Sequence, residues 1–237
     1  MIVNCDAKGL EWYTATYLAQ DKTAFQEILE GIDTHSANQD FFKLPSRLVA
    51  KKFLFRIIYA DLKFAANTYA NDPEFAETSS SRKFWQQVID RFVDKYDGFV
   101  KWEQRMLQEV TTTGHIVMPT GRVYNFERNK YGEWPISTIK NWPRQGLGAD
   151  IMSIARVSFS RRFLSSGIKG LQVNTVHDSI VCDIEDSDVE ATVKMFHAVF
   201  ADLPANFEKM FKVKFNLPLR CEVCVGKNMK ELTEFVV

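Results

Sequence analysis

The stretch VHDSIV, Val176–Val181, places three polar residues between two apolar runs. Upstream the chain reads LQVNTV, and downstream it reads IVCDI. Two short strand-like runs that meet at a polar junction predict a β-hairpin. Tight hairpin turns usually contain Asn-Gly or Asp-Gly, because these residues tolerate positive φ, yet the junction His177-Asp178-Ser179 has no glycine. The junction is either an ordinary tight turn or a place where Asp178 is kept for its charge.

The composition is that of a folded globular chain. Of the 237 residues, 46% are hydrophobic and 25% are charged, so disorder is not expected. Thirty basic residues balance thirty acidic ones, which argues against a nucleic-acid protein with a general basic excess but leaves room for a local basic track. The aromatic content is raised to 13%, and core packing is its simplest explanation.

The four cysteines are too few and too scattered for a disulfide framework, and they suit a reducing compartment. Cys221 and Cys224 form a lone CxxC in a strand-like run, LPLRCEVCV. Strand alternation sends their sulfurs to opposite faces, so a metal pair is not expected there. Because the sequence shows neither a signal peptide nor an apolar run of about 18 residues, we expect a cytoplasmic chain without a membrane partner.

Hydrophobic periodicity predicts an α+β fold with strands at both ends of the chain. MIVNCD, at Met1–Asp6, reads as a short buried strand, and a strand this close to the start predicts that another segment usually precedes it. Residues 22–113 read as mostly helical. Within them Gly31 is expected to cap one helix, and Pro45 is expected at the first position of another that reaches Ala60.

The second half of the chain returns to strands. Residues 115–126 predict a hairpin that turns at PTGR, and the segment from there to Pro143 reads as a loop. A long helix is expected from Gln145, followed by the hairpin around VHDSIV. A further helix over residues 190–203 and a last strand pair around CEVCV complete the pattern.

Four residues spaced four apart form a stripe along the helix after Pro45: Arg47, Lys51, Phe55 and Tyr59. Each step advances about 40° past a full turn, so the stripe winds slowly over about 18 Å. General experience favours an amphipathic helix whose basic residues extend to solvent. The functional alternative is a nucleotide site, because basic residues near a helix N-terminus suit phosphate and aromatic rings stack on a sugar or base.

Asp6 and Asp178 each end or interrupt an apolar strand. They could be two unrelated turn or capping residues. If their strands are neighbours, however, the two carboxylates need a cation between them. Magnesium takes few protein carboxylates together with substrate phosphate oxygens, and a pair of such ions about 4 Å apart serves phosphoryl chemistry.

Taken together, these segments resemble a known family. DAKGLE, RLVAKKFLFRIIYA and VHDSIV occur in the order and at the spacing of the three polymerase motifs of family A DNA polymerases, the DNA polymerase I class. NWPRQGLGADI resembles the family's N-x-P-x-Q-G segment, TGRVY the hairpin before it, and LRCEVCVGKN the end of the fold. Thr34-His35, twelve positions before Arg47, has a counterpart in phage-type members.

The resemblance implies an antiparallel palm sheet with flanking helices and a mostly helical fingers insertion. The first part of the palm, with the catalytic strand, covers residues 1–20, the fingers cover residues 21–140, and the second part of the palm, with the catalytic hairpin, covers residues 141–237. The implied activity is that of a DNA-directed DNA polymerase, which transfers a nucleotide from a dNTP to a primer 3′-hydroxyl on a primer-template DNA. If the chain is phage-encoded, it acts in the cytoplasm of a bacterial host.

The resemblance also implies the catalytic and metal-binding residues. Asp6 and Asp178 hold two Mg²⁺ ions, and the backbone carbonyl of Ala7 completes one coordination sphere. The ions lower the pKa of the primer 3′-hydroxyl and align it for in-line attack. Lys51 protonates the leaving pyrophosphate.

Further residues match positions that contact the nucleotide and the DNA. Arg47 and Lys51 grip the β- and γ-phosphates, and His35 adds a phosphate contact. Phe55 packs beneath the incoming sugar and base, and Tyr59 guards the place of the templating base. Glu11 matches the steric gate that excludes a 2′-hydroxyl. Three residues match positions that line the primer terminus and template: Asn141, Gln145 and His177.

Three residues depart from the family pattern. Ser179 stands where the family usually has a glutamate, Ser137 where an arginine often lies, and Ala60 where a glycine commonly follows the tyrosine. Ser179 weakens the expected metal site but spares Asp178. A non-catalytic nucleic-acid-binding subunit derived from a polymerase is therefore the alternative to an active enzyme.

Family members carry a thumb, a proofreading-like domain and a further palm segment before the first motif. These parts precede the match and have no counterpart here. The expectation is either a phage-type split polymerase, in which a second polypeptide supplies the thumb and a 3′–5′ exonuclease-like domain, or a dissected part of a longer polymerase. That partner is expected to cover an unpaired sheet edge near Met1.

Overall fold

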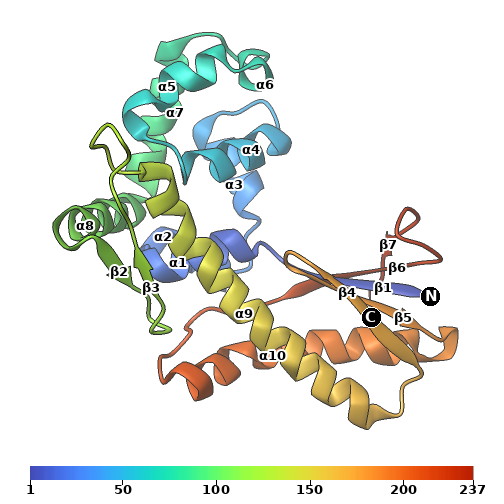
Figure 1. Cartoon of the computed structure of the whole chain (residues 1–237). Coiled ribbons are helices and arrows are strands. Elements are labelled where there is room, and N and C mark those ends of the chain that lie inside the picture. Colours follow the sequence, from blue (N-terminus) through green and yellow to red (C-terminus); the bar gives the residue numbers. More distant parts are fainter. Residues whose placement is uncertain (237) are drawn as a thin grey trace. The chain divides into compact units, whose positions relative to one another are not determined.

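A computed structural model of the chain describes residues 1–236 and divides into two compact units (Figure 1). Unit 1 comprises residues 1–14 and the residues from Gln145 onward, and unit 2 comprises residues 15–144. Each unit has its own core. The observed helices and antiparallel sheet confirm the α+β fold class, whereas the palm and fingers boundaries stay predictions.

Unit 1 contains a five-stranded antiparallel sheet in the order β4-β5-β1-β6-β7. Its strands are β1 (Ile2–Ala7), β4 (Gly170–Val176), β5 (Ser179–Ile184), β6 (Cys221–Gly226) and β7 (Thr233–Glu234). The first strand lies in the centre, because β1 pairs with β5 on one side and with β6 on the other. The expectation of an unpaired edge near Met1 is therefore wrong, and the sheet edges are β4 and β7.

Helices cover one face of this sheet. The helix α10 (Val189–Phe211) contacts β1 and β6 and follows a short 3₁₀ turn, η1 (Asp186–Asp188). Its Phe196 stacks on Phe159 of α9 with ring centroids 4.0 Å apart. Residues of β1 alternate between the buried core and a half-exposed face, as strand geometry requires. Asp6 lies on the half-exposed face.

Unit 2 is mostly helical, as the periodicity predicts. It contains α2 (Lys22–Leu29), α3 (Thr34–Phe42), α4 (Arg47–Ile57), α5 (Leu62–Asn71), α6 (Pro73–Ala76), α7 (Arg82–Lys95), α8 (Asp97–Thr113) and the hairpin β2 (His115–Val117) and β3 (Val123–Asn125). Its core is aromatic: Phe53 contacts the rings of Phe42, Tyr69, Trp85 and Phe92. The raised aromatic content is therefore largely core packing.

Helix α4 differs from its predicted bounds at both ends. It begins at Arg47, because Ser46 is the N-cap residue and its side chain accepts a hydrogen bond from the amide of Val49. Pro45 precedes the cap and is not the first helical residue. The helix ends at Ile57, so Tyr59, the last member of the stripe, follows the helix instead of lying on it.

Two prolines that were expected to end or precede helices lie inside them. Helix α9 (Ile136–Ser166) starts nine residues before Gln145 and runs through Pro143. The predicted loop is therefore confirmed for residues 127–135 and wrong for residues 136–143. Helix α10 likewise continues through Pro204. A proline removes one helical hydrogen bond, and packing of the surrounding helix compensates for it. The N-terminal part of α9 is held by Lys140 and Arg144, which are both buried.

The remaining expectations concern cysteines and membranes. All four thiols are free, and Cys221 is buried while Cys224 is only half-buried, as expected for opposite faces of β6. Helix α1 (Leu10–Ala19) follows β1 as predicted, and Gly31 has a φ of 70° just beyond the cap of α2. No helix in residues 1–236 is both long and apolar enough to cross a bilayer.

Candidate active site

The hairpin predicted from VHDSIV joins β4 to β5 through a two-residue turn. Val176 pairs with Ser179, and His177 and Asp178 form the turn between them. His177 has a φ of 51°, a conformation that usually favours glycine. It is exposed, whereas Asp178 is half-buried. The turn therefore accepts a strained side chain at its first position and presents a carboxylate at its second.

Strand pairing brings the two aspartates to neighbouring positions. Asp6 pairs with Ser179 across β1 and β5, and the amide of Ala7 donates a 3.1 Å hydrogen bond to the carbonyl of Asp178. The hydroxyl of Ser179 donates a 2.8 Å hydrogen bond to Oδ1 of Asp6. Asp178 thus shares one end of the sheet with Asp6 and Ala7, although it lies far from them in sequence.

A further carboxylate faces Asp6 from the other side. Glu222 of β6 pairs with Asp6 in the strand register, but its side chain forms a 2.9 Å ion pair with Lys8. No group of three or more His, Cys, Asp or Glu side chains within residues 1–236 is arranged to hold a metal. The sheet end therefore offers two carboxylates and the Ala7 carbonyl, a sparse oxygen set that fits Mg²⁺ completed by phosphate oxygens.

Two more predicted residues belong to unit 1. Glu11 is half-buried in the first turn of α1, where its carbonyl accepts a 3.0 Å hydrogen bond from the Thr14 hydroxyl. Gln145 is exposed on α9.

In unit 2, the predicted phosphate ligand Arg47 already has an anionic partner. Its Nε and Nη2 lie 2.8 and 2.7 Å from Oδ2 of Asp33. Asp33 is also the N-cap of α3, because its Oδ1 accepts hydrogen bonds from the amides of His35 and Ser36. Burial tends to raise the pKa of Asp33, but the Arg47 guanidinium and these amides outweigh it and lower that pKa. Asp33 thus occupies the Arg47 fork that a phosphate would need.

His35 and Phe55 are brought together from α3 and α4. Their ring centroids are 5.7 Å apart. Burial, together with the charge of Arg47, lowers the pKa of His35 to about 4, so the ring is neutral near pH 7. The Nδ1 atom of His35 is buried and has no hydrogen-bond partner within residues 1–236. Buried polar atoms usually have a hydrogen-bond partner, so this nitrogen is available to a ligand or a water molecule.

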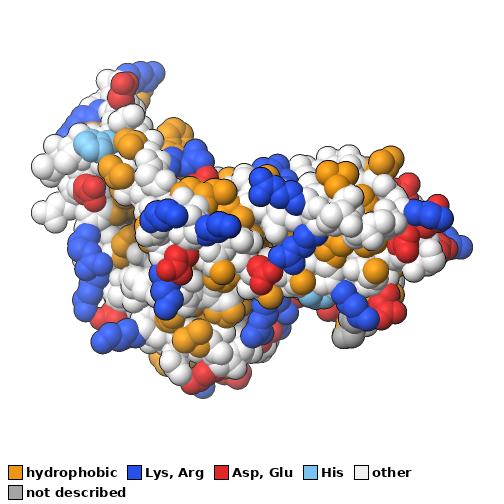
Figure 2. Space-filling model, turned by 90° about the horizontal axis from the view of Figure 1, so that it is seen from below, with side chains coloured by type: hydrophobic (Ala, Val, Ile, Leu, Met, Phe, Trp, Pro, Cys, Tyr) orange, Lys and Arg blue, Asp and Glu red, His pale blue; other side chains and the backbone are white. Residues whose placement is uncertain are grey.

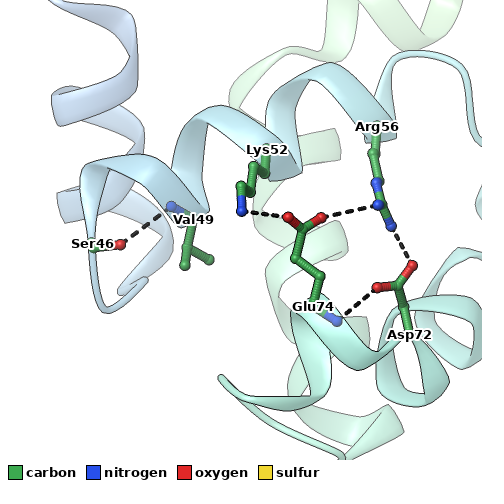
Figure 3. Close-up of polar contacts among 6 residues, drawn as sticks. All are labelled: Ser46, Val49, Lys52, Arg56, Asp72 and Glu74. Atoms are coloured by element: carbon green, nitrogen blue, oxygen red, sulfur yellow. Dashed lines mark hydrogen bonds and ion pairs between the residues drawn. The ribbon is translucent and has the colours of Figure 1, made fainter.

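The opposite face of α4 is tied to α6. The carboxylate of Glu74 forms ion pairs with Lys52 and with Arg56, whose Nη2 lies 3.0 Å away. Asp72 also forms an ion pair with the Arg56 guanidinium (Figure 3). These four side chains link α4 to α6 on a face of α4 that does not carry the stripe of Arg47, Lys51 and Phe55. Lys51 is exposed and makes no ion pair with another described residue.

Tyr59 lies beside a buried ionic cluster that consists of Glu103, Lys140 and Arg144. Glu103 binds Lys140 at 2.7 Å and also binds Arg144. The Arg144 guanidinium carbon lies 5.2 Å from the centre of the Tyr59 ring. On the same helix, Asn141 has a buried side-chain oxygen that no group in residues 1–236 contacts by a hydrogen bond.

The sequence reasoning missed four residues at these sites. Asp33 directly precedes Thr34-His35 and is a residue type that favours N-cap positions, which was its signal. Lys140 and Arg144 are four apart, the spacing of one helix face, but Pro143 led to a loop prediction. Glu103 had no signal, because nothing in one sequence shows which charged residue of an amphipathic helix is buried.

The comparisons with known proteins identify a family. The family model of DNA polymerase family A matches residues 1–231. The chain is 28% identical over 193 residues to DNA polymerase I of Aquifex aeolicus (strain VF5), which covers 78% of this chain and 32% of that protein. It is 22% identical over 197 residues to a DNA polymerase of Bacillus phage SP01, which covers 81% of this chain and 21% of that protein.

A solved structure shares the fold. The POL domain of Pol1 from M. smegmatis, in complex with DNA primer-template and dNTP, superposes with a TM-score of 0.77 at 16% identity, covering 96% of this chain and 39% of that chain. The chain spans 32% or less of the curated relatives named above. Since the family model covers nearly the whole sequence, the chain belongs to DNA polymerase family A.

Proposed function

We propose that this chain carries out template-dependent nucleotidyl transfer from a dNTP to a primer 3′-hydroxyl, as the palm and fingers portion of a DNA-directed DNA polymerase. The observation that carries the proposal is the pairing of β1 with β5, which brings Asp6 beside the Asp178 turn. Family membership makes a shared chemistry the first expectation for such a site.

Asp6, Asp178 and the carbonyl of Ala7 would hold two Mg²⁺ ions. When bound, these ions would lower the pKa of the primer 3′-hydroxyl and stabilise the negative charge on the transferred phosphate. The protein groups hold the carboxylates in place: the Ser179 hydroxyl orients Asp6, and the Ala7 amide ties the Asp178 backbone to β1.

The stripe of Arg47, Lys51 and Phe55 on α4 would bind the incoming dNTP. Arg47 and Lys51 lie at the N-terminal part of the helix, where cations and the helix dipole both favour phosphate. His35, neutral at pH 7, would donate a hydrogen bond to a phosphate oxygen, and Lys51 would serve as the proton donor to pyrophosphate. Phe55 would pack against the sugar and base, because its ring already borders His35.

The remaining residues would contact the DNA and the sugar. Glu11 would exclude a 2′-hydroxyl, and Tyr59 would guard the templating position. The primer terminus and the template would be contacted by a set of polar side chains, Asn141, Gln145 and His177. The buried, unpartnered oxygen of Asn141 supports a ligand at that place.

A second polypeptide would supply the thumb and the 3′–5′ exonuclease-like domain of a split, phage-type enzyme. The similarity to a DNA polymerase of a Bacillus phage supports the phage-type part of this proposal. Charge supports the second polypeptide, since the net charge is zero and Figure 2 shows basic side chains dispersed among acidic and apolar ones on one face. Strong duplex binding generally requires a concentrated basic surface.

Primer extension tests the proposal. The chain is assayed with Mg²⁺, dNTPs and a primed template, alone and with the polypeptide encoded beside it in its genome. We expect extension that Asp178→Asn abolishes and that Asp183→Asn, a matched change at an exposed aspartate of the following strand β5, leaves intact. Extension that survives Asp178→Asn contradicts the two-metal site.

One observation favours a second function. Ser179 replaces a carboxylate expected by resemblance, so the chain could bind primed DNA without catalysis. DNA binding without extension under any metal or partner condition identifies that function.

A further inference from the structure

The cluster of Glu103, Lys140 and Arg144 is buried in unit 2. Arg144 is 0% exposed, and Glu103 and Lys140 are each 4% exposed. One carboxylate faces two cations, so the cluster has one positive charge in excess. Isolated buried charge is costly, and the excess must be balanced by other nearby groups.

Backbone carbonyls at the end of α4 provide that balance. Nη1 of Arg144 donates to the carbonyl of Ile58, and Nζ of Lys140 donates to the carbonyl of Ala60 at 2.7 Å. Both carbonyls lie just past the C-terminus of α4, where the helix dipole is negative and carbonyls lack helical partners. The two cations therefore cap the end of the helix that carries the predicted nucleotide-binding stripe.

Aromatic rings also stabilise the excess positive charge of the cluster. The guanidinium carbon of Arg144 lies 4.8 Å from the ring centre of Phe99, 5.3 Å from that of Trp102 and 5.2 Å from that of Tyr59. These distances are in the range of cation–π attraction, which is stronger when the cation is shielded from water. Tyr59 is therefore held from its ring face, while the residues on both sides of it are held by their carbonyls.

We propose that Arg144 is a positioning residue that fixes the ring of Tyr59. Arg144 and Lys140 anchor the backbone carbonyls on either side of that ring, and Glu103 holds the two cations in place. The proposal rests on the proposed function, because it assigns to Arg144 a share in selecting the matched nucleotide through Tyr59. Arg144 touches neither nucleotide nor DNA in this role. Arg144 lies on α9 between two predicted DNA contacts, three residues after Asn141 and directly before Gln145.

Arg144→Met is the decisive variant. It removes the cation while filling the space, and it leaves Glu103 and Lys140 as a balanced pair, so the chain is expected to fold. Arg144→Lys keeps the charge but loses the planar fork and the stacking. Arg128→Met is the matched control, since Arg128 lies 4.8 Å above the Trp134 ring but is exposed and distant from α4 in sequence.

Nucleotide insertion is the first readout. For Arg144→Met we expect insertion of the matched nucleotide to lose about tenfold in kcat/KM, with a smaller loss for mismatches, because small misplacements are costly for a well-aligned substrate. Arg144→Lys is expected to restore only part of the loss, and Arg128→Met to match the wild type. Equal losses for matched and mismatched nucleotides would show a merely structural role.

A double-variant cycle separates the two interpretations. If Arg144 acts through Tyr59, Arg144→Met adds no further loss of discrimination to Tyr59→Ala. Additive losses overturn the proposal.

A second readout does not depend on activity. In the chain labelled with fluorotyrosine, the ¹⁹F resonance that Tyr59→Phe removes identifies Tyr59. We expect Arg144→Met to shift this resonance toward that of free fluorotyrosine and Arg128→Met to leave it in place. An unmoved resonance overturns the proposal even if the enzyme is active, whereas a moved resonance in a chain that never extends primers rejects the proposed function alone.

Discussion

The hydroxyl of Ser179 donates a 2.8 Å hydrogen bond to Oδ1 of Asp6 across β5 and β1. Ser179 is the residue that departs from the glutamate expected after the hairpin aspartate. This contact means that Ser179 orients one carboxylate of the proposed metal site and supplies no carboxylate of its own. The proposed site accordingly has two carboxylates, those of Asp6 and Asp178.

Ser179→Glu is expected to strengthen metal binding. A third carboxylate beside Asp6 raises the negative charge of the site, so the Mg²⁺ concentration for half-maximal extension should fall by about tenfold. Titration of extension rate against Mg²⁺ measures this. Ser187→Glu adds the same charge at an exposed position of unit 1 and should leave the titration unchanged; a lower midpoint in both variants means that only general charge matters.

Asp33→Asn is expected to improve dNTP binding. Asparagine caps a helix as well as aspartate does, so α3 is preserved, but the carboxylate that holds Arg47 is lost. The KM for dNTP should fall about twofold to fivefold, the range for an exposed ion pair worth up to about 1 kcal/mol.

The control is Asp61→Asn, because Asp61 caps α5 through the amide of Lys63. Its KM should equal that of the wild type. An unchanged or higher KM in Asp33→Asn means that Asp33 does not compete with phosphate for Arg47.

His35 predicts a pH dependence of stability. The pKa of His35 is lowered by burial, and by Arg47, from 6.5 to about 4, so between these values the unfolded chain binds a proton that the folded chain refuses. The free energy of unfolding contributed by neutral His35 is complete above pH 6.5 and falls as the pH drops toward 4.

Chemical denaturation at pH 7 and pH 4.5 measures this effect. His35→Gln removes the titrating ring and should lose less stability than the wild type over that interval, while His115→Gln should follow the wild type. Parallel losses in the wild type and His35→Gln contradict the buried, neutral ring.

Glu11→Ala is expected to admit ribonucleotides. The half-buried Glu11 side chain follows Asp6 by five residues and would occupy the space of a 2′-hydroxyl. Its removal should raise the ratio of ribonucleotide to deoxynucleotide insertion by about tenfold or more, because a filled pocket discriminates by that factor per small group. Competing insertion of UTP and dTTP checks it, and an unchanged ratio contradicts the gate.

Much of the fold could be predicted from local patterns. Alternation in MIVNCD and the polar junction of VHDSIV predicted β1 and the β4–β5 hairpin, because both signals depend on neighbouring residues. The order β4-β5-β1-β6-β7 could not be predicted in this way, since long-range pairing places Met1 at the centre of the sheet. The helices through Pro143 and Pro204 were missed because tertiary packing outweighed proline's intrinsic cost.

Part of the candidate site could likewise be predicted from the sequence, and part could not. Spacing identified the Arg47–Tyr59 stripe and the two aspartates, whose residue types suit phosphate and metal. It did not show that Asp33 binds Arg47 or that Arg144 lies against Tyr59, because these contacts join segments that are separated in sequence. Burial of Glu103 depends on α8 packing against α9, which no single-sequence periodicity can reveal.

Both connections between unit 1 and unit 2 run inside helices: residues 14 and 15 lie within α1, and residues 144 and 145 lie within α9 (Figure 1). Backbone in mid-helix is hydrogen-bonded and resists proteases, which cleave exposed loops. Limited digestion should therefore not release the two units as intact fragments. Separate expression of unit 2 would require a cut through α1 and α9 and would leave each helix with a frayed end. Glycine-containing turns are therefore better sites for dividing the chain than the boundary between the units.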